Sequence, residues 1–570
     1  MKSDKTVIII GILVCIASLF ASSSQFVNVG VTPKWLGMMI CVGIAGMVFR
    51  KMAHPLLVII AVCFLLIFTR NLITHRFCPS LLMYLCGLLL LLHLALQIYS
   101  VSSTRYLFGA IIVFALALSI YGILQYVGIM TSDNSNFAVK GNFDNPAGFA
   151  SALACILPLC LFFLNEKTKY VKYTAIVSGI LIAIAIVLSG SRTGILAVVT
   201  AILVWSLFQY KMTTRRFLSG IILATFGVAL LISLYFLKKE SADGRLLIWQ
   251  NTWDMVAEKP VFGHGVGAFQ EKYMLYQAAY FDTNADSRFA QLADNTLYPF
   301  NEYLFVLVEY GFVGLGIVTL LFLGLMFSYR RNPCEKKLTA LMSLLALAVF
   351  SFFSYPFRYP FSWVMLFLNV SILAPVPNHR WKVLRFKHLK HTDLFYKSGM
   401  LLLSTGVLAL SIGMIRAEIT WYRIARQAIA GKMSEVSPEY ERLYSWLGSN
   451  GFFLYNHAVE LNITREFERS IVVFERCMRH NNDLDIQMFQ AENFKELGKY
   501  AEAELLLKTA ANMCPARFMP LYKLVKLYVE TDRKDEALLL ANKIMNKDVK
   551  IPSTTVDTIK NEMRQMLEAQ

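Results

Sequence analysis

Thirteen long apolar stretches dominate this chain and restrict it to folds that can satisfy their backbone hydrogen bonds inside a lipid bilayer. A helix needs roughly 17–25 apolar residues to cross the hydrocarbon region, and it pairs its backbone groups internally. The composition agrees, because 56% of the 570 residues are hydrophobic and the mean hydropathy is +0.52. We therefore predict an all-α, polytopic membrane protein. The predicted spans are approximately 6–24, 35–49, 53–69, 80–99, 106–127, 147–164, 173–190, 193–210, 217–237, 301–328, 338–355, 359–376 and 398–416.

The distribution of basic residues predicts the orientation of these spans. With the N-terminus in the cytoplasm, the cytoplasmic loops hold 21 Lys and Arg, whereas the short loops on the opposite face hold seven. Lys and Arg concentrate in the cytoplasmic loops of membrane proteins. An odd number of spans then places the polar loop 238–300 and the tail 417–570 on the outer face. In a bacterial inner membrane, that face is the periplasm.

The net charge of +17 does not indicate a nucleic-acid partner, because the excess lies in short loops between spans. From residue 417 onward there are 21 Lys and Arg against 22 Asp and Glu, and loop 238–300 holds 6 against 8. The ten cysteines are scattered without a Cys-x-x-Cys pair. We therefore expect buried thiols, with neither a zinc site nor a disulfide framework.

The tail contains an internal repeat. Three similar segments begin at Phe467, Tyr500 and Lys534, and each opens an amphipathic helix. Their spacing matches the period of tetratricopeptide repeats, about 34 residues, in which each repeat is a pair of helices. Gly498 and Asp532 lie just before two of these helices, where a tight turn is needed. We predict about three degenerate repeats, which either bind a protein partner or brace the membrane part.

Two outer-face turns carry candidate polar contacts. Asn142 and Asn145 stand at the mouth of the sixth span, where they either shape a turn and a helix start or contact a headgroup or sugar. Ser191 and Arg192 stand between two spans with almost no loop. Arg192 either snorkels to the interface or binds an anion at the start of a helix, and we favour phosphate binding.

The long loop adds a second arginine, Arg245, which we expect at the start of a helix. The apolar residues behind it recur at helical spacing, namely Leu246, Trp249, Trp253 and Val256. This helix should therefore lie along the membrane surface, with the tryptophans as interface anchors rather than as a platform for a sugar. Arg245 could join Arg192 on one diphosphate, because guanidinium groups form paired hydrogen bonds with phosphate oxygens.

The span that follows the loop begins with Asn301 and Glu302 and carries Glu309 two turns further on. An acid inside a span is costly and is usually functional or paired, so Glu309 is either catalytic or paired with a structural partner such as Arg358. Two other patterns are rejected. Segment 282–293 lacks the glycine and the glutamate of an EF-hand calcium loop. The glycines of 263–267 lie outside any βαβ unit, so they indicate a turn rather than a nucleotide site.

Together, these motifs resemble the O-antigen ligase and polymerase family, which includes bacterial protein O-oligosaccharyltransferases. The resemblance covers roughly residues 140–375. It is carried by Ser189-Gly190-Ser191-Arg192, by Arg245 with Trp249, by Pro260-x-x-Gly263-x-Gly265, by Asn301-Glu302-Tyr303-Leu304 and by Glu309-x-Gly311-x-x-Gly314. The tetratricopeptide-like tail is similar to the tails of some members.

The resemblance implies a GT-C-like membrane enzyme that moves a glycan from an undecaprenyl-diphosphate carrier to an acceptor, with inversion and without a metal or cofactor. Arg192 and Arg245 would hold the donor diphosphate. Many members carry His immediately before the Asn at position 301, where this chain has Phe300, so His264 or Glu302 is expected to act as the catalytic base. The residues expected to support the site or the acceptor are Ser191, Asn301, Glu309, Arg358, Asn142 and Asn145.

The acceptor is expected to be the lipid A–core or a protein hydroxyl group. One alternative is a polymerase that extends one lipid-linked repeat with another, and another is a non-catalytic transporter or membrane scaffold. A transporter is disfavoured, because the clearest acids and arginines lie near one face and not at the bilayer midplane. The predicted domains are the N-terminal spans 1–137, a catalytic membrane region 138–376, a basic cytoplasmic loop with the last span 377–416, and the periplasmic repeats 417–570.

Overall fold

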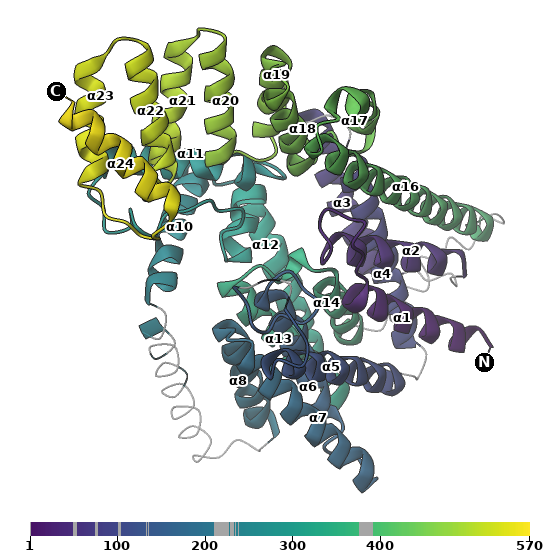
Figure 1. Ribbon diagram of the computed structural model, residues 1–570. Coiled ribbons are helices and arrows are strands. Elements are labelled where there is room, and N and C mark those ends of the chain that lie inside the picture. The colour runs from purple at the N-terminus through teal and green to yellow at the C-terminus, as the bar shows by residue number, and fades with distance from the viewer. Residues whose placement is uncertain are drawn as a thin grey trace. The chain divides into compact units, whose positions relative to one another are not determined.

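The computed structural model describes residues 2–48, 54–74, 78–100, 104–132, 134, 136–209, 227, 233, 235–236, 239–374 and 392–569. Within these ranges every regular element is helical, as predicted (Figure 1). The chain divides into two compact units. The first comprises Met1–Phe236, Phe300–Glu302 and Gly316–Ile419. The second comprises Leu237–Pro299, Tyr303–Leu315 and Thr420–Gln570.

Helices occupy twelve of the thirteen predicted spans; the span at 217–237 and the basic residues 380–391 lie largely outside the described residues. The twelve are α1 (Lys2–Phe20), α2 (Thr32–Val48), α3 (Pro55–Thr74), α4 (Pro79–Ser100), α5 (Thr104–Tyr126), α6 (Pro146–Phe162), α7 (Lys169–Leu188), α8 (Arg192–Gln209), α12 (Glu302–Arg331), α13 (Glu335–Phe353), α14 (Pro360–Leu373) and α16 (Thr392–Ile429). Of the helices described, seven are long and apolar enough to cross a membrane, and five more are shorter and apolar. The chain is thus a multi-pass membrane protein.

The centre of the first unit is α6, which is apolar on all sides and buried from Gly148 to Cys160. It packs against α7, α8 and α13, and its alanines and Gly148 let neighbouring backbones approach closely. A short polar chain crosses this interior. Asn369 donates to the Ser343 hydroxyl (2.8 Å), which in turn donates to the carbonyl oxygen of Cys155 (2.6 Å). These hydrogen bonds tie α14, α13 and α6 together.

Two of these helices differ most from straight spans of the predicted length. α12 is kinked at Gly311, whose φ and ψ are 64° and −165°. α16 runs from Thr392 to Ile429, whereas the predicted span was 398–416. This helix therefore ends 13 residues beyond the predicted end of the span.

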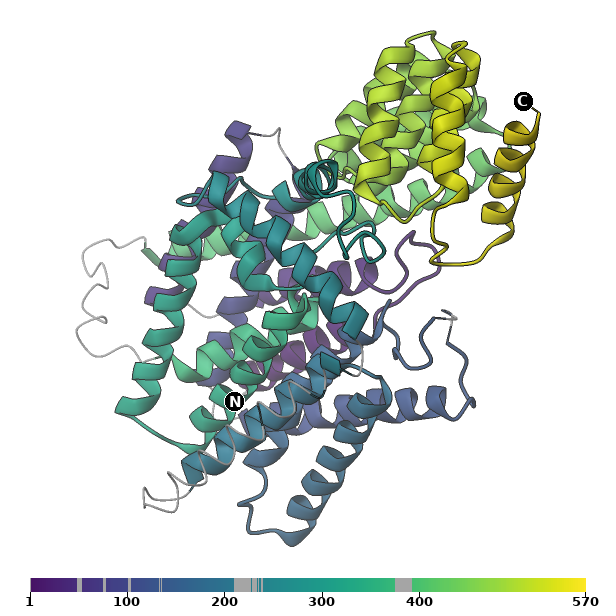
Figure 2. The ribbon, with the colours of Figure 1, turned by 90° about the vertical axis from the view of Figure 1, so that its left-hand side faces the viewer.

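The tail of the second unit is built of helix pairs at the predicted period (Figure 2). Its helices are α17 (Met433–Leu447), α18 (Gly451–Ile463), α19 (Phe467–Met478), α20 (Leu484–Glu496), α21 (Tyr500–Met513), α22 (Met519–Glu530), α23 (Lys534–Met545) and α24 (Thr554–Glu568). The three predicted helices begin at Phe467, Tyr500 and Lys534, as expected. Arg465, Gly498 and Asp532 lie just before these helices and have positive φ (62°, 73° and 57°), which closes the tight turn within each pair.

Candidate functional site

Asn142 and Asn145 belong to the turn before α6, and the side chains of both form hydrogen bonds with backbone groups. The Asn145 side chain caps α6, because its Oδ1 accepts from the amides of Ala147 and Gly148 at 2.9 and 3.1 Å. Its Nδ2 donates to the Tyr355 hydroxyl at 3.3 Å. Asn142 donates to the carbonyl of Leu19 at 2.8 Å. The helix-start interpretation of this turn is therefore correct, and Asn145 also reaches a second polar group.

An ion pair that the sequence did not suggest lies beside this turn. Arg358, in η1 (Pro356–Arg358), pairs with Asp144 at 2.8 Å, and the Tyr359 hydroxyl donates to the same carboxylate at 2.7 Å. Trp35 donates to the carbonyl of Arg358 at 2.9 Å. Asp144 was missed because its partner lies far away in the sequence, although an isolated acid in the turn before α6 was the available signal.

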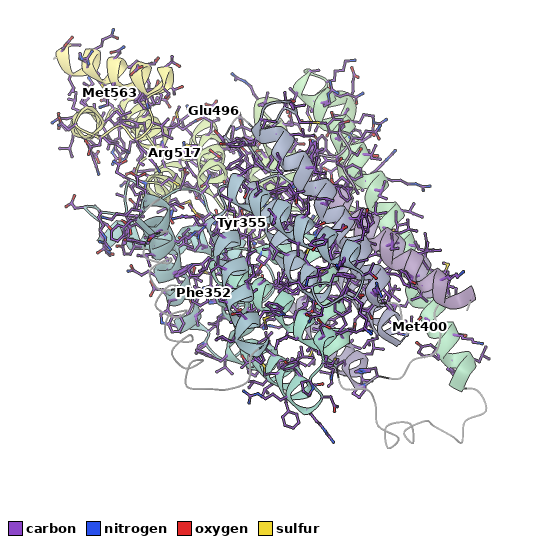
Figure 3. All side chains as sticks on the ribbon, turned by 90° about the horizontal axis from the view of Figure 1, so that it is seen from below. Phe352, Tyr355, Met400, Glu496, Arg517 and Met563 are labelled. Carbon is purple, nitrogen blue, oxygen red and sulfur yellow. The ribbon has the colours of Figure 1, made fainter. Side chains whose placement is uncertain are left out.

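The junction between loop and α12 brings Glu302 to the same place. Glu302 Oε1 accepts from the amide of Phe357 at 3.1 Å, next to Arg358, and Asn301 is 4% exposed. Phe300, which stands at the family's His position, has φ of 52°. A bulky residue in this left-handed region is unusual and often marks a functional site. Its ring packs on that of Tyr355, with the ring centroids 5.2 Å apart. Tyr355, labelled in Figure 3, follows the end of α13 by two residues.

The structure therefore brings together, within the first unit, five of the residues expected in the site. Asn145 is linked through Tyr355, Arg358 through Asp144, and Glu302 through the amide of Phe357, whereas Asn142 and Asn301 adjoin them along the chain. We call these five residues, with Asp144 and Tyr355, the three-loop cluster. Its contacts link three loops: the turn before α6, the start of α12 and η1.

Arg192 is the first residue of α8, as predicted. The preceding Ser191 caps this helix, since its Oγ accepts from the amide of Gly194 at 3.3 Å. Gly190 makes the tight turn from α7 with φ of 68°. A half-buried arginine at a capped helix start combines a guanidinium group with the positive end of a helix dipole, which suits an anion.

Arg245 belongs to the second unit and does not start its helix. α10 runs from Lys239 to Glu258, so Arg245 lies near the end of its second turn, because residues 239–244 also adopt helical geometry. Only part of the predicted apolar face of α10 is exposed. Leu246 and Trp253 are exposed, at 43% and 51%, but Val256 is buried with the face that packs on α11 (Ala268–Thr283). Trp249 donates to the carbonyl of Pro299 at 2.9 Å, so it anchors the end of the loop.

The two glycine motifs of the second unit interlock. The amides of His264 and Gly265 donate to the carbonyls of Val308 and Glu309, at 2.7 and 3.0 Å. In return, the amides of Phe312 and Val313 donate to the carbonyls of Pro260 and Val261, at 2.8 and 3.1 Å. The loop segment thus satisfies the backbone groups that the kink at Gly311 leaves without helical partners.

Only glycine fits at the two crossing points of this interlock. A Cβ on Gly263 would lie 2.6 Å from backbone atoms of Glu309 and Tyr310, and one on Gly311 would lie 2.3 Å from the carbonyl oxygen of Val261. Both residues also have positive φ, 65° and 64°. Close backbone approach therefore explains glycine at both positions.

Glu309 and His264 are held by backbone groups near this interlock. Glu309 is 4% exposed, and its Oε1 accepts from the amide of Gly267, the N-cap of α11, at 2.7 Å. A carboxylate at a helix N-terminus is stabilised there. The suggested partner Arg358 instead pairs with Asp144. His264 donates through Nε2 to the carbonyl of Met255 at 2.8 Å, and its Nδ1 is buried.

Comparison with known proteins supports the family resemblance over a central segment. Residues 177–319 match the family model described as O-antigen ligase. A search of curated proteins finds no match. Among solved structures, the crystal structure of yeast Tom70 is similar over 80% of this chain and 95% of that chain, with 10% identity and a TM-score of 0.23. The matched segment includes Arg192, Arg245, His264, Glu302 and Glu309. Residues 177–319 of this multi-pass membrane protein are therefore similar to the O-antigen ligase family, and this similarity supports a membrane function of the glycan ligase or polymerase type.

Proposed function

We propose that this protein transfers a glycan from an undecaprenyl-diphosphate carrier to an acceptor hydroxyl group at the periplasmic face of the bacterial inner membrane. The observation that carries the proposal is Arg192 at the capped start of α8, inside the segment that matches the O-antigen ligase model. The acceptor is lipid A–core or a protein hydroxyl. The periplasmic face follows from the distribution of Lys and Arg among the loops.

In this reaction the acceptor oxygen attacks the anomeric carbon, the bond from that carbon to the diphosphate oxygen breaks, and the configuration inverts. Negative charge develops on the departing diphosphate. Fixed cations at a dry membrane boundary stabilise such charge without reorganising. We assign this role to Arg192 and Arg245, whose forked guanidinium groups match phosphate oxygens.

The acceptor hydroxyl must lose its proton as it attacks, and a positioned base accelerates this step by about 10²–10⁴-fold. Glu302 and His264 are the candidates. We favour Glu302, because His264 Nε2 donates a hydrogen bond to the carbonyl oxygen of Met255, and the other ring nitrogen, Nδ1, is buried. Glu302 also lies within the three-loop cluster, where it accepts from the amide of the residue before Arg358. The remaining residues of the cluster, with Ser191 and Glu309, would support the site.

The test is transfer of lipid-linked glycan in membranes that contain arginine variants. Arg192→Ala and Arg245→Ala should each nearly abolish transfer, and Lys at either position should restore it only partly, because an ammonium group keeps the charge and loses the fork. The double variant should be little worse than either single one, since residues that act as a unit are not additive.

Arg288→Ala is the matched control, because Arg288 is an exposed arginine of the same loop that lies over the Phe289 ring. It should transfer at the wild-type rate. Wild-type transfer by Arg192→Ala would show that Arg192 only anchors the chain at the membrane surface. Lipid A and glycoprotein profiles of a deletion strain would then distinguish the two acceptors, and shortened chains would indicate a polymerase.

A further inference from the structure

The loop between α10 and α12 and the second helix pair of the repeats complete one another's hydrogen bonding. Gln277 of α11 is fully buried. Its Nε2 donates to the carbonyl of Met513 at 2.6 Å, and its Oε1 accepts from the Tyr273 hydroxyl at 2.8 Å. Met513 is the last residue of α21, so its carbonyl has no partner within its own helix. The loop therefore caps the end of α21.

The start of α20 is completed from the same loop. The Asp483 side chain accepts from the amides of Asp485 and Ile486, at 3.1 Å each. The amide of Leu484, the first residue of the helix, donates instead to Asn295 Oδ1 of the loop at 3.2 Å. Immediately before Asp483, the amide of Asn482 donates to the carbonyl of Gln270 at 3.1 Å. Loop atoms thus serve both open ends of the pair α20–α21.

A charged pair reinforces this contact. Arg517, labelled in Figure 3, stands in the chain between α21 and α22. One of its terminal nitrogens contacts both carboxylate oxygens of Asp294 at 2.9 Å. Nearby, Asn512 donates to Asp282 at 3.0 Å. The partners in each case are far apart in the sequence, so these contacts are tertiary ones. They fasten the loop segment 268–299 at the C-terminal end of α21.

We propose that the second repeat pair holds the loop in the conformation needed for glycan transfer, with Gln277, Asp294 and Arg517 as positioning residues. The repeats then form part of the transferase itself. The predicted effect on glycan transfer rests on the proposed function. The contact between the repeats and the loop does not depend on that function. A repeat domain that only recruited a partner would have no need to cap its own helices with groups from the loop.

Hydrogen exchange on the full-length protein in detergent tests the fastening independently of activity. The amides of 268–299 should exchange about tenfold faster or more in Gln277→Leu, because an unpartnered buried carbonyl shifts the local opening equilibrium by that order. Asp294→Arg and Arg517→Asp should each loosen the same peptides, and the double reversal should restore their protection. Unchanged exchange in all three single variants would overturn the proposal.

The control is Lys526→Glu. Lys526 pairs with Glu562 at 2.8 Å between α22 and α24, and the two side chains are 50% and 37% exposed, close to the 50% and 43% of Arg517 and Asp294. This variant should leave the peptides of 268–299 unchanged. Equal loosening by Lys526→Glu would show a general loss of repeat stability and would contradict a specific role for the loop contacts.

Glycan transfer provides the second readout. Each single reversal should lower the rate at saturating donor, and the double reversal should recover it, which a loss of folding would not allow. If exchange changes while transfer stays at the wild-type rate, the contact exists without positioning the loop for reaction, and the proposal fails. If the wild-type protein transfers no glycan, the proposed function fails, and hydrogen exchange still decides whether the repeats fasten the loop.

Discussion

Replacing Gly311 by alanine should open the interlock between the glycine segment and α12. The φ and ψ of this residue, 64° and −165°, fall in a region that is almost confined to glycine, where another residue costs about 1–3 kcal/mol. The new Cβ would also lie 2.3 Å from the Val261 carbonyl oxygen and would displace that segment. This displacement weakens the bonds from Phe312 and Val313, each worth about 0.5–1.5 kcal/mol.

We therefore expect Gly311→Ala to lower the free energy of local opening by about 2–6 kcal/mol. The amides of His264, Gly265, Phe312 and Val313 should then exchange about 30-fold faster or more, since about 1.4 kcal/mol is a tenfold change in an equilibrium constant. Transfer should fall with them, because the loop that carries Arg245 is no longer held on α12.

Gly316→Ala, in the same helix, provides the control. A Cβ there meets no atom within 4 Å, so the change should be neutral or should stabilise the helix by up to about 1 kcal/mol. If these amides exchange as slowly in Gly311→Ala as in Gly316→Ala, the interlock contributes no stability. Close backbone approach would then not explain glycine at position 311.

Four further outcomes are expected. Glu302→Gln should lower transfer by about 10²-fold or more if Glu302 is the base, whereas His264→Ala should cost less, and the reverse order would exchange their roles. Burial, followed by the charge of Arg469, lowers the pKa of His457 from 6.5 to about 4. Between pH 6.5 and pH 4, His457 is therefore protonated in the unfolded chain and neutral in the folded repeats. The free energy of unfolding should fall by about 3 kcal/mol as the pH drops from 6.5 to 4. Exchange of peptides 440–478 should report this loss, and His457→Phe should remove it. A phosphatase fused after Gln570 should be active and one fused near residue 385 inactive; the opposite pattern would reverse the proposed orientation. Membranes treated with a chelator should keep their transfer activity, and loss that a divalent ion restores would indicate a metal site.

Helix type and helix position follow from the sequence because each depends on neighbouring residues. Apolar runs long enough to cross a bilayer predicted twelve helices that the structure contains. The tetratricopeptide-like period placed the starts of α19, α21 and α23 at the correct residues. A helix start at the turn that holds Asn145 was one of two interpretations, and the helix start at Arg192 was predicted, because turn chemistry is local.

Partners distant in the chain could not be predicted in this way. Asp144 meets Arg358, Glu309 meets the amide of Gly267, and Arg517 meets Asp294, although no single-sequence pattern links these positions. The glycines of the two family motifs were recognised in the sequence. Only the structure shows that Gly263 and Gly311 must be glycine because the backbones of their two segments cross. The sequence therefore determined which segments are helices, because hydrophobicity and period act along the chain. The tertiary structure alone decided which polar groups meet, because that choice depends on how helices distant in sequence pack.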